Sequence, residues 1–146
     1  GEACHFIDLM RFLTGSEIKS FSAEKIGDNE YDAISEDKCS IYLSFEDGSM
    51  GTIHYFANGD KSFPKERIEV FCDKSILQLD NFKKLKGYGW PGFSKMNLWK
   101  QDKGQLNCVK EFLDSINNQT ENPIPENEIF EVARVSIEIS KIVMTK

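Results

Sequence analysis

The stretch "CSIYLSFEDGSMGTIHYFA", residues 39–57, decides the fold. Its first seven residues alternate apolar and polar side chains with a strict period of two, which is typical of a strand with one buried face. The dipeptide Asp47-Gly48 that follows is a strong signal for a tight hairpin turn. Residues 50–57 then return as a partner strand. This stretch therefore predicts an antiparallel hairpin with Cys39, Ile41, Leu43 and Phe45 on one face.

The residues before this hairpin predict a helix and a weaker strand. Apolar residues at helical spacing form one face of the helix, which ends at Thr14-Gly15: Phe6, Leu9, Met10 and Leu13. No capping residue precedes this helix, so we expect the natural chain to continue upstream. Residues 18–26 alternate as a strand, and residues 27–38 form a polar connection.

The residues after the hairpin predict a second hairpin and two helices. Residues 67–72 and 75–82 flank Asp73-Lys74, residues 83–90 add a further strand, and residues 87–97 form an aromatic, glycine-rich loop. Helical spacing begins at Lys103, and a last helix begins near Pro125. Its predicted buried stripe is Ile129, Val132, Ala133, Ser136, Ile139 and Val143.

Grouped strands and helices indicate an α+β fold, an open and mostly antiparallel sheet with helices packed on one face. The many aromatic residues predict that the other face meets a partner.

Composition limits the class of protein. The 146 residues suit one globular domain, with a net charge of −6, 40% hydrophobic and 29% charged residues. The acidic balance argues against nucleic acid, and no apolar run is long enough to span a membrane. The four cysteines show no CxxC pair, so we expect free thiols in a reduced, cytoplasmic protein: Cys4, Cys39, Cys72 and Cys108.

Both histidines are candidates for chemistry. Glu2, His5 and Asp8 are spaced by three and share a helical face, where an imidazole beside carboxylates could transfer protons. The alternative is a structural histidine held by Asp8, and spacing alone favours it. His54 lies in a strand, where cross-strand packing is the simpler role. No spacing of ligands supports a metal site.

The loop after the first hairpin carries a local basic cluster, made of Asn58, Lys61, Lys65 and Arg67. Such a cluster could hold a phosphate or a carboxylate, or it could simply be a solvated loop. No nucleophile elbow, dinucleotide fingerprint or phosphate loop occurs.

Five segments, in order along the whole chain, resemble the second domain of the Gfo/Idh/MocA oxidoreductases, the glucose-fructose oxidoreductase and inositol dehydrogenase family. They are "GEACHFIDLMRFLTG", "DKCSIYLSFEDGSMGTIHYFA", "RIEVFCDKSILQLD", "KGQLNCVKEFLDSI" and "NPIPENEIFEVARVSIEISK". The resemblance implies that residues 1–146 are a single C-terminal substrate-binding and oligomerisation domain, like that of glyceraldehyde-3-phosphate dehydrogenase. An N-terminal Rossmann domain, absent from this chain, would bind NAD or NADP, and we expect no cofactor in the chain itself.

The resemblance also implies roles for residues. His5 matches the family's acid or base on a sugar, cyclitol or sugar-nucleotide hydroxyl, and Asp8 matches a supporting carboxylate. The family's catalytic Asp falls at Gly1, which leaves Glu2 as the nearest carboxylate. Many members have a histidine where Gln105 follows Lys103-Gly104. These departures keep open a second hypothesis, a ligand-binding or dimerisation module without catalysis. In both cases we expect a homo-oligomer that associates through the sheet face.

Overall fold

The computed structural model describes residues 2–27 and 38–145, so most of the predicted polar connection lies outside the described residues. The chain divides into two compact units. Unit 1 consists of Gly1–Asn58 and Glu121–Lys146, and unit 2 consists of Gly59–Thr120. The described strands correspondingly form two antiparallel sheets, one in each unit, within the predicted α+β class.

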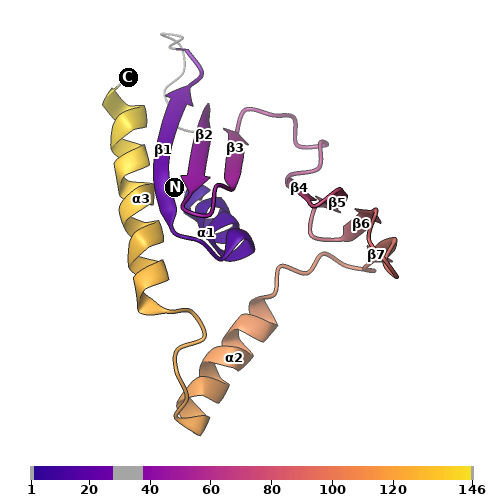
Figure 1. Cartoon of the computed structure of the whole chain (residues 1–146). Helices are drawn as coiled ribbons and strands as arrows, with labels where there is room; N and C mark the ends of the chain where they lie inside the picture. Colours follow the sequence, from indigo (N-terminus) through magenta and orange to yellow (C-terminus); the bar gives the residue numbers. More distant parts are fainter. Residues whose placement is uncertain (1, 28–37, 146) are drawn as a thin grey trace. The chain divides into compact units, whose positions relative to one another are not determined.

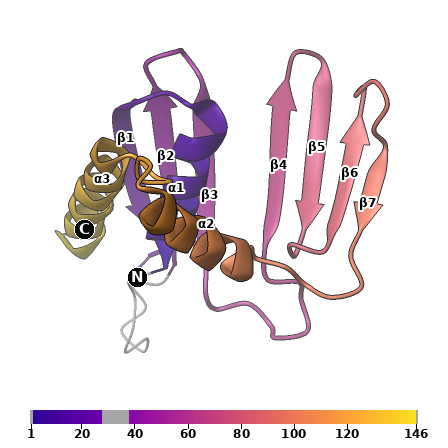
Figure 2. The same cartoon turned by 90° about the horizontal axis from the view of Figure 1, so that it is seen from below.

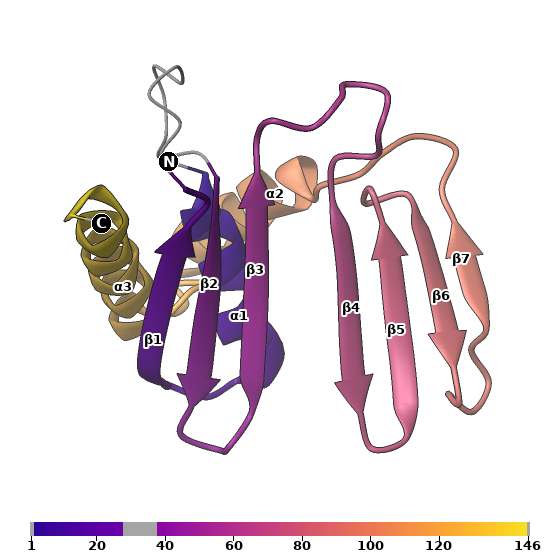
Figure 3. The ribbon, with the colours of Figure 1, turned by 90° about the horizontal axis from the view of Figure 1, so that it is seen from above.

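Unit 1 is a three-stranded sheet covered by helices on one face. Its elements are α1 (Ala3–Thr14), β1 (Ile18–Lys25), β2 (Lys38–Phe45), β3 (Met50–Phe56) and α3 (Glu126–Thr145). The strand order is β1-β2-β3, which we call sheet A. Helix α3 runs beside β1 (Figure 1), and both α1 and α3 lie behind sheet A in Figure 3. The predicted hairpin is therefore the centre of this unit.

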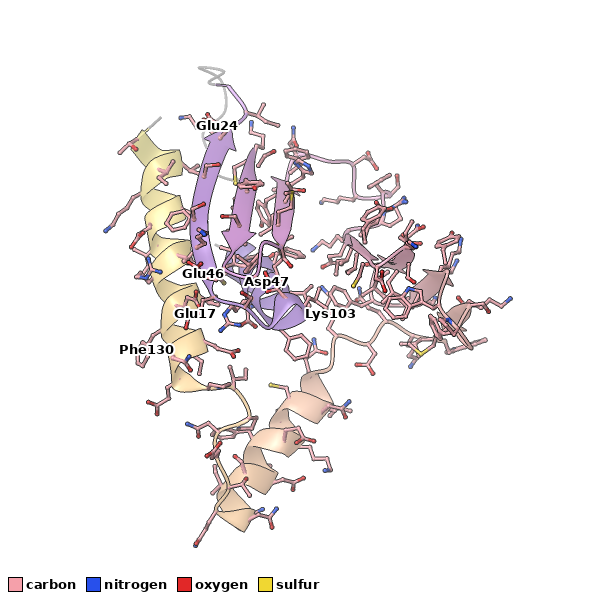
Figure 4. All side chains as sticks on the ribbon, in the orientation of Figure 1. Glu17, Glu24, Glu46, Asp47, Lys103 and Phe130 are labelled. Carbon is pink, nitrogen blue, oxygen red and sulfur yellow. The ribbon has the colours of Figure 1, made fainter. Side chains whose placement is uncertain are left out.

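The core of unit 1 lies between sheet A and these helices. The four predicted apolar positions of β2 are all buried, with Leu43 fully inaccessible. They meet Ile7 from α1, Ile53 from β3 and a stripe of α3 made of Val132, Val135, Ile139 and Val143. The helix prediction was partly wrong, because Ile129 and Ala133 are exposed. The buried stripe is centred on Val135, and Phe130 projects from α3 on the side away from the sheet (Figure 4).

Local chemistry explains the ends and turns of unit 1. Gly15 adopts the predicted left-handed conformation (φ 63°), and its N–H donates to the carbonyl of Arg11. At the β2–β3 turn, Asp47 accepts hydrogen bonds from the backbone N–H and the hydroxyl of Ser49, both of 2.9 Å. These bonds lower the pKa of the Asp47 carboxyl, with the backbone bond contributing most. The turn that the sequence predicted is thus reinforced by its own side chains.

Unit 2 is a four-stranded sheet followed by a helix. Its elements are β4 (Arg67–Cys72), β5 (Ser75–Asp80), β6 (Lys84–Tyr88), β7 (Lys95–Asn97) and α2 (Gln105–Asn118). The strand order is β4-β5-β6-β7, which we call sheet B (Figure 2). The apolar stripe of α2 is exposed, with Leu106 88% accessible.

Strand β7 corrects the sequence-based expectation of a loop over residues 87–97. The chain folds back after β6 and pairs with it, with Lys86 opposite Lys95. Gly87 leaves room for the ring of Phe93 in this turn. Any other residue at position 87 would place its Cβ 2.7 Å from that ring. A strand of three residues is too short for its alternation to be visible in the sequence. The second predicted hairpin is confirmed, with Asp73 and Lys74 both left-handed at its turn.

Within the described residues, no helix is both long enough and apolar enough to cross a membrane.

Candidate functional site

The exposed face of α1 carries the three residues that the sequence singled out. Helix α1 buries Ile7 and Arg11 and packs against α3 and β3. The opposite face leaves Glu2, His5 and Asp8 exposed. The helix therefore presents an imidazole with one carboxylate three residues before it and another three residues after it.

The side chain of His5 is not held by Asp8. Among residues 2–27 and 38–145, no hydrogen bond or ion pair joins these two side chains. The structural alternative of a histidine clamped to Asp8 therefore has no support in the contacts. An imidazole that is open to its surroundings can take a proton from a bound hydroxyl group, or return one to it.

Phe12 belongs to the same face, although the sequence did not predict it as part of the site. It lies seven residues, about two helical turns, after His5, and its side chain is 75% exposed. The signal was present in the spacing, but the sequence does not show which apolar residues of an amphipathic helix remain uncovered.

A pocket of about 160 Å³ lies on the core side of α1. It is lined by the first turn of α1 together with β2, β3 and α3. Glu2 lines it, but His5 and Asp8 do not. Cys4 and Cys39 both line it, and burial raises the pKa of the Cys39 thiol. These two cysteines, like Cys72 and Cys108, form no disulfide.

The predicted basic cluster is only partly available for a ligand. Arg67 donates two hydrogen bonds to Glu69 Oε1, at 3.0 Å from Nε and 2.7 Å from Nη2, and these bonds raise the pKa of the guanidinium. Lys61 and Lys65 are exposed, and neither makes an ion pair with any described residue. Asn58 belongs to unit 1, whereas the three cationic residues belong to unit 2.

His54 makes the predicted cross-strand contact. Its Nδ1 lies 2.9 Å from the hydroxyl of Ser40, which is its partner in the β2–β3 register. Its ring also stacks on Phe56, with the ring centroids 5.6 Å apart. Within the described ranges, no three His, Cys, Asp or Glu side chains gather as a metal site.

Comparison with known proteins gives a family and a fold. Residues 2–78 match the family model described as the GFO/IDH/MocA C-terminal domain. No curated protein matches the chain.

Solved structures with low sequence identity share the fold. UDP-N-acetylglucosamine 3-dehydrogenase from Acidithiobacillus ferrooxidans aligns with a TM-score of 0.74 and 16% identity, over 97% of this chain and 45% of that one. The aldose-aldose oxidoreductase of Caulobacter crescentus, complexed with glycerol, aligns with a TM-score of 0.71 and 17% identity, over 98% of this chain and 44% of that one. The WlbA dehydrogenase of Bordetella pertussis, in complex with NADH and UDP-GlcNAcA, aligns with a TM-score of 0.58 and 16% identity, over 99% of this chain and 42% of that one. The present chain thus spans less than half the length of these proteins.

Proposed function

The chain belongs to the GFO/IDH/MocA C-terminal domain family, and from that premise we propose that it is the substrate-binding domain of an NAD(P)-dependent oxidoreductase. The reaction would interconvert a CH–OH group and a carbonyl on a sugar, cyclitol or sugar nucleotide. The observation that carries the proposal is the exposed imidazole of His5 between two carboxylates on the uncovered face of α1.

His5 would handle the hydroxyl proton. In the oxidation direction, its neutral imidazole accepts the proton as the carbinol carbon loses a hydride, and in the reduction direction the imidazolium returns it. Glu2 and Asp8 would flank the imidazole on the same side of the helix. The phenyl ring of Phe12 would help to exclude water once a second domain covers this face.

The nicotinamide would be held outside this chain. All described strands pair antiparallel, so the described residues contain no parallel βαβ unit of the kind that binds dinucleotides. We therefore assign the NAD or NADP site to an N-terminal Rossmann domain of the complete protein. The nicotinamide accepts or supplies the hydride when it is bound. The aligned proteins are more than twice as long as this chain, which supports a cofactor site in a separate domain.

The substrate class rests on the family and on the loop between the two units. The aligned proteins include a UDP-N-acetylglucosamine dehydrogenase and an aldose-aldose oxidoreductase. Lys61 and Lys65 would bind an anionic group of the substrate, together with the remaining donors of Arg67.

We also assign self-association to the outer face of sheet A, the face opposite the helices. It presents mainly neutral polar and aromatic side chains: Ser20, Ser22, Ser40, Tyr42, Ser44, Met50, Thr52, His54 and Phe56. Glu24 and Lys38 are the charged residues in this register. In a twofold dimer the same patch lies on both subunits, so a nearly neutral face can pack on itself. This face also favours the second candidate function, a dimerisation module without catalysis.

Replacing His5 in the full-length protein separates the two functions. We expect His5→Ala to lower kcat by about 10²-fold or more while the affinity for NAD(P) stays unchanged, since general acid–base catalysis contributes that much. His54→Ala is the matched control, because its imidazole is engaged by Ser40. We expect this control to remain within a few-fold of the parent. If His5→Ala also retains activity within a few-fold, His5 is not the proton carrier and the dimerisation module becomes the better conclusion.

A further inference from the structure

Two lysines on sheet B lie directly opposite each other. Lys86 of β6 pairs in register with Lys95 of β7, and both side chains are exposed. Residues directly opposite in an antiparallel pair have Cα atoms about 4.5–5.5 Å apart and point to the same face. Like charges in this position destabilise a sheet. The unit therefore carries a local electrostatic cost that its own fold does not require.

No carboxylate among the described residues forms an ion pair with either ammonium group. The register places Gln78 next to Lys86, and Glu69 beyond it. Glu69 is engaged with Arg67 at 2.7 Å. Neither Lys86 nor Lys95 forms a salt bridge or a side-chain hydrogen bond within residues 2–27 and 38–145. Both ammonium groups are free to bind a ligand.

A third lysine extends the pair along the strand. Lys84 lies two residues before Lys86 and therefore on the same face, displaced by about 6.6 Å. Asp80 lies opposite Lys84 in the register, so the charge of Lys84 has a carboxylate next to it, whereas the charges of Lys86 and Lys95 do not. In an acidic chain, residues 83–103 contain six lysines and one acidic residue. Three of these six lysines, Lys84, Lys86 and Lys95, lie on this face, which also carries Glu69 and Asp80.

Aromatic residues flank the lysines on the same face. Tyr88 follows Lys86 by two residues and is 50% exposed, and Phe71 lies in the same row and is 71% exposed. Trp90 lies close by, because its indole N–H donates to the carbonyl of Ile76 at 3.0 Å. Exposed aromatic rings next to cations are suited to a ligand that has both an anionic group and a flat or apolar part.

We propose that Lys84, Lys86 and Lys95 form a binding site for the diphosphate group of a small molecule. One phosphate would bridge Lys86 and Lys95, which removes their repulsion, and the second would reach Lys84 along the strand. Lysine is a general phosphate ligand that acts as a point charge, so this site needs no bidentate geometry. The proposal does not depend on the chemistry of His5.

The test is the thermal unfolding midpoint of the chain in inorganic pyrophosphate, measured against sodium chloride of the same ionic strength. We expect pyrophosphate to raise the midpoint beyond the effect of the salt, and a calorimetric titration to show saturable binding. The Lys86→Gln/Lys95→Gln double variant should lose at least tenfold in affinity. Lys74→Gln is the matched control, because Lys74 is an exposed lysine on the β4–β5 turn of the same unit, and it should bind as the parent does.

A charge-reversal variant gives a second, opposite readout. In Lys95→Glu a carboxylate faces Lys86, so the midpoint without pyrophosphate should rise while the effect of pyrophosphate disappears. Parallel titrations with a nucleoside diphosphate and a sugar monophosphate identify the source of the phosphate group. If sodium chloride reproduces the pyrophosphate effect, or if the double variant binds as tightly as the parent, the site does not exist and the lysines are only a charged surface.

Discussion

Arg11 Nε donates a hydrogen bond of 2.8 Å to Glu131 Oε2, and the side chains of both residues are largely buried, with 6% and 14% exposed. The second oxygen of Glu131 accepts the backbone N–H of Ile18. A more distant contact of 3.7 Å joins Arg11 to Glu128. One carboxylate thus connects α1, α3 and the start of β1, and it fixes the helix that carries His5.

Removing Arg11 should destabilise unit 1 strongly. Arg11→Ala leaves the carboxylate of Glu131 buried without its cation, and breaking a buried pair in this way costs about 3–5 kcal/mol. The free energy of unfolding from urea titration measures the loss. Arg134→Ala is the control, because its pair with Glu138 on α3 is exposed and worth about 0.3–0.5 kcal/mol. Equal losses in the two variants would show that the buried pair is not a main support of α1.

The sequence predicted the elements whose signals are local. The hairpin of β2 and β3 was predicted because alternation and the Asp47-Gly48 turn both lie within one short stretch. The pairing of Arg11 with Glu131 could not be predicted, because 120 residues separate them and many carboxylates compete. For the same reason the buried stripe of α3 was predicted only in part: Val132, Ile139 and Val143 are buried as expected, but Ile129 and Ala133 are exposed, because the surface that the helix packs against decides which face is buried.

The candidate sites differ in the same way. Helical spacing alone places His5 and Asp8 on one face of α1, so the sequence could propose them. The pair of Lys86 and Lys95 depends on the register of β6 with β7, and β7 was expected to be loop. A site that depends on strand register appears only when the strand itself is known.

Gly51 of β3 should not tolerate a side chain. A Cβ at this position would lie 2.5 Å from the sulfur of Met10, so in Gly51→Ala the Met10 side chain must leave its place between α1 and the sheet. We expect a loss of about 1–3 kcal/mol in the free energy of unfolding, as for other overpacked cores. Met10→Ala in the same chain should recover part of this loss by making room. Gly27→Ala serves as the control, because nothing lies within 4 Å of a Cβ there. A neutral Gly51→Ala would show that Met10 moves aside without cost.

The β2–β3 turn should lose stability in acid. Hydrogen bonds from Ser49 lower the pKa of Asp47 in the folded state below the usual value of about 3.9. The stabilisation is therefore fully present above that value and is lost as the pH falls through the folded pKa. Asp47→Asn should lower the unfolding midpoint at pH 7, and the difference from the parent should shrink towards pH 3. Asp73→Asn, at the β4–β5 turn, is the comparison. A difference that stays constant with pH would mean that the charge of Asp47 is not what stabilises the turn.

Charge placed on the outer face of sheet A should break the proposed self-association. Tyr42 lies on the central strand of this face, in register with Ser22 and Thr52. In a twofold dimer through this face, Tyr42→Glu brings two carboxylates together, and like-charge contacts across an interface cost several kcal/mol. Sedimentation velocity should therefore show the parent chain associating and Tyr42→Glu as monomer at the same concentration. Phe71→Glu places the same charge on sheet B, at an aromatic residue that is more exposed than Tyr42 (71% against 37%), and should leave the dimer intact. If Phe71→Glu dissociates the dimer and Tyr42→Glu does not, the interface lies on sheet B. The lysines of that sheet would then face a second copy of the chain.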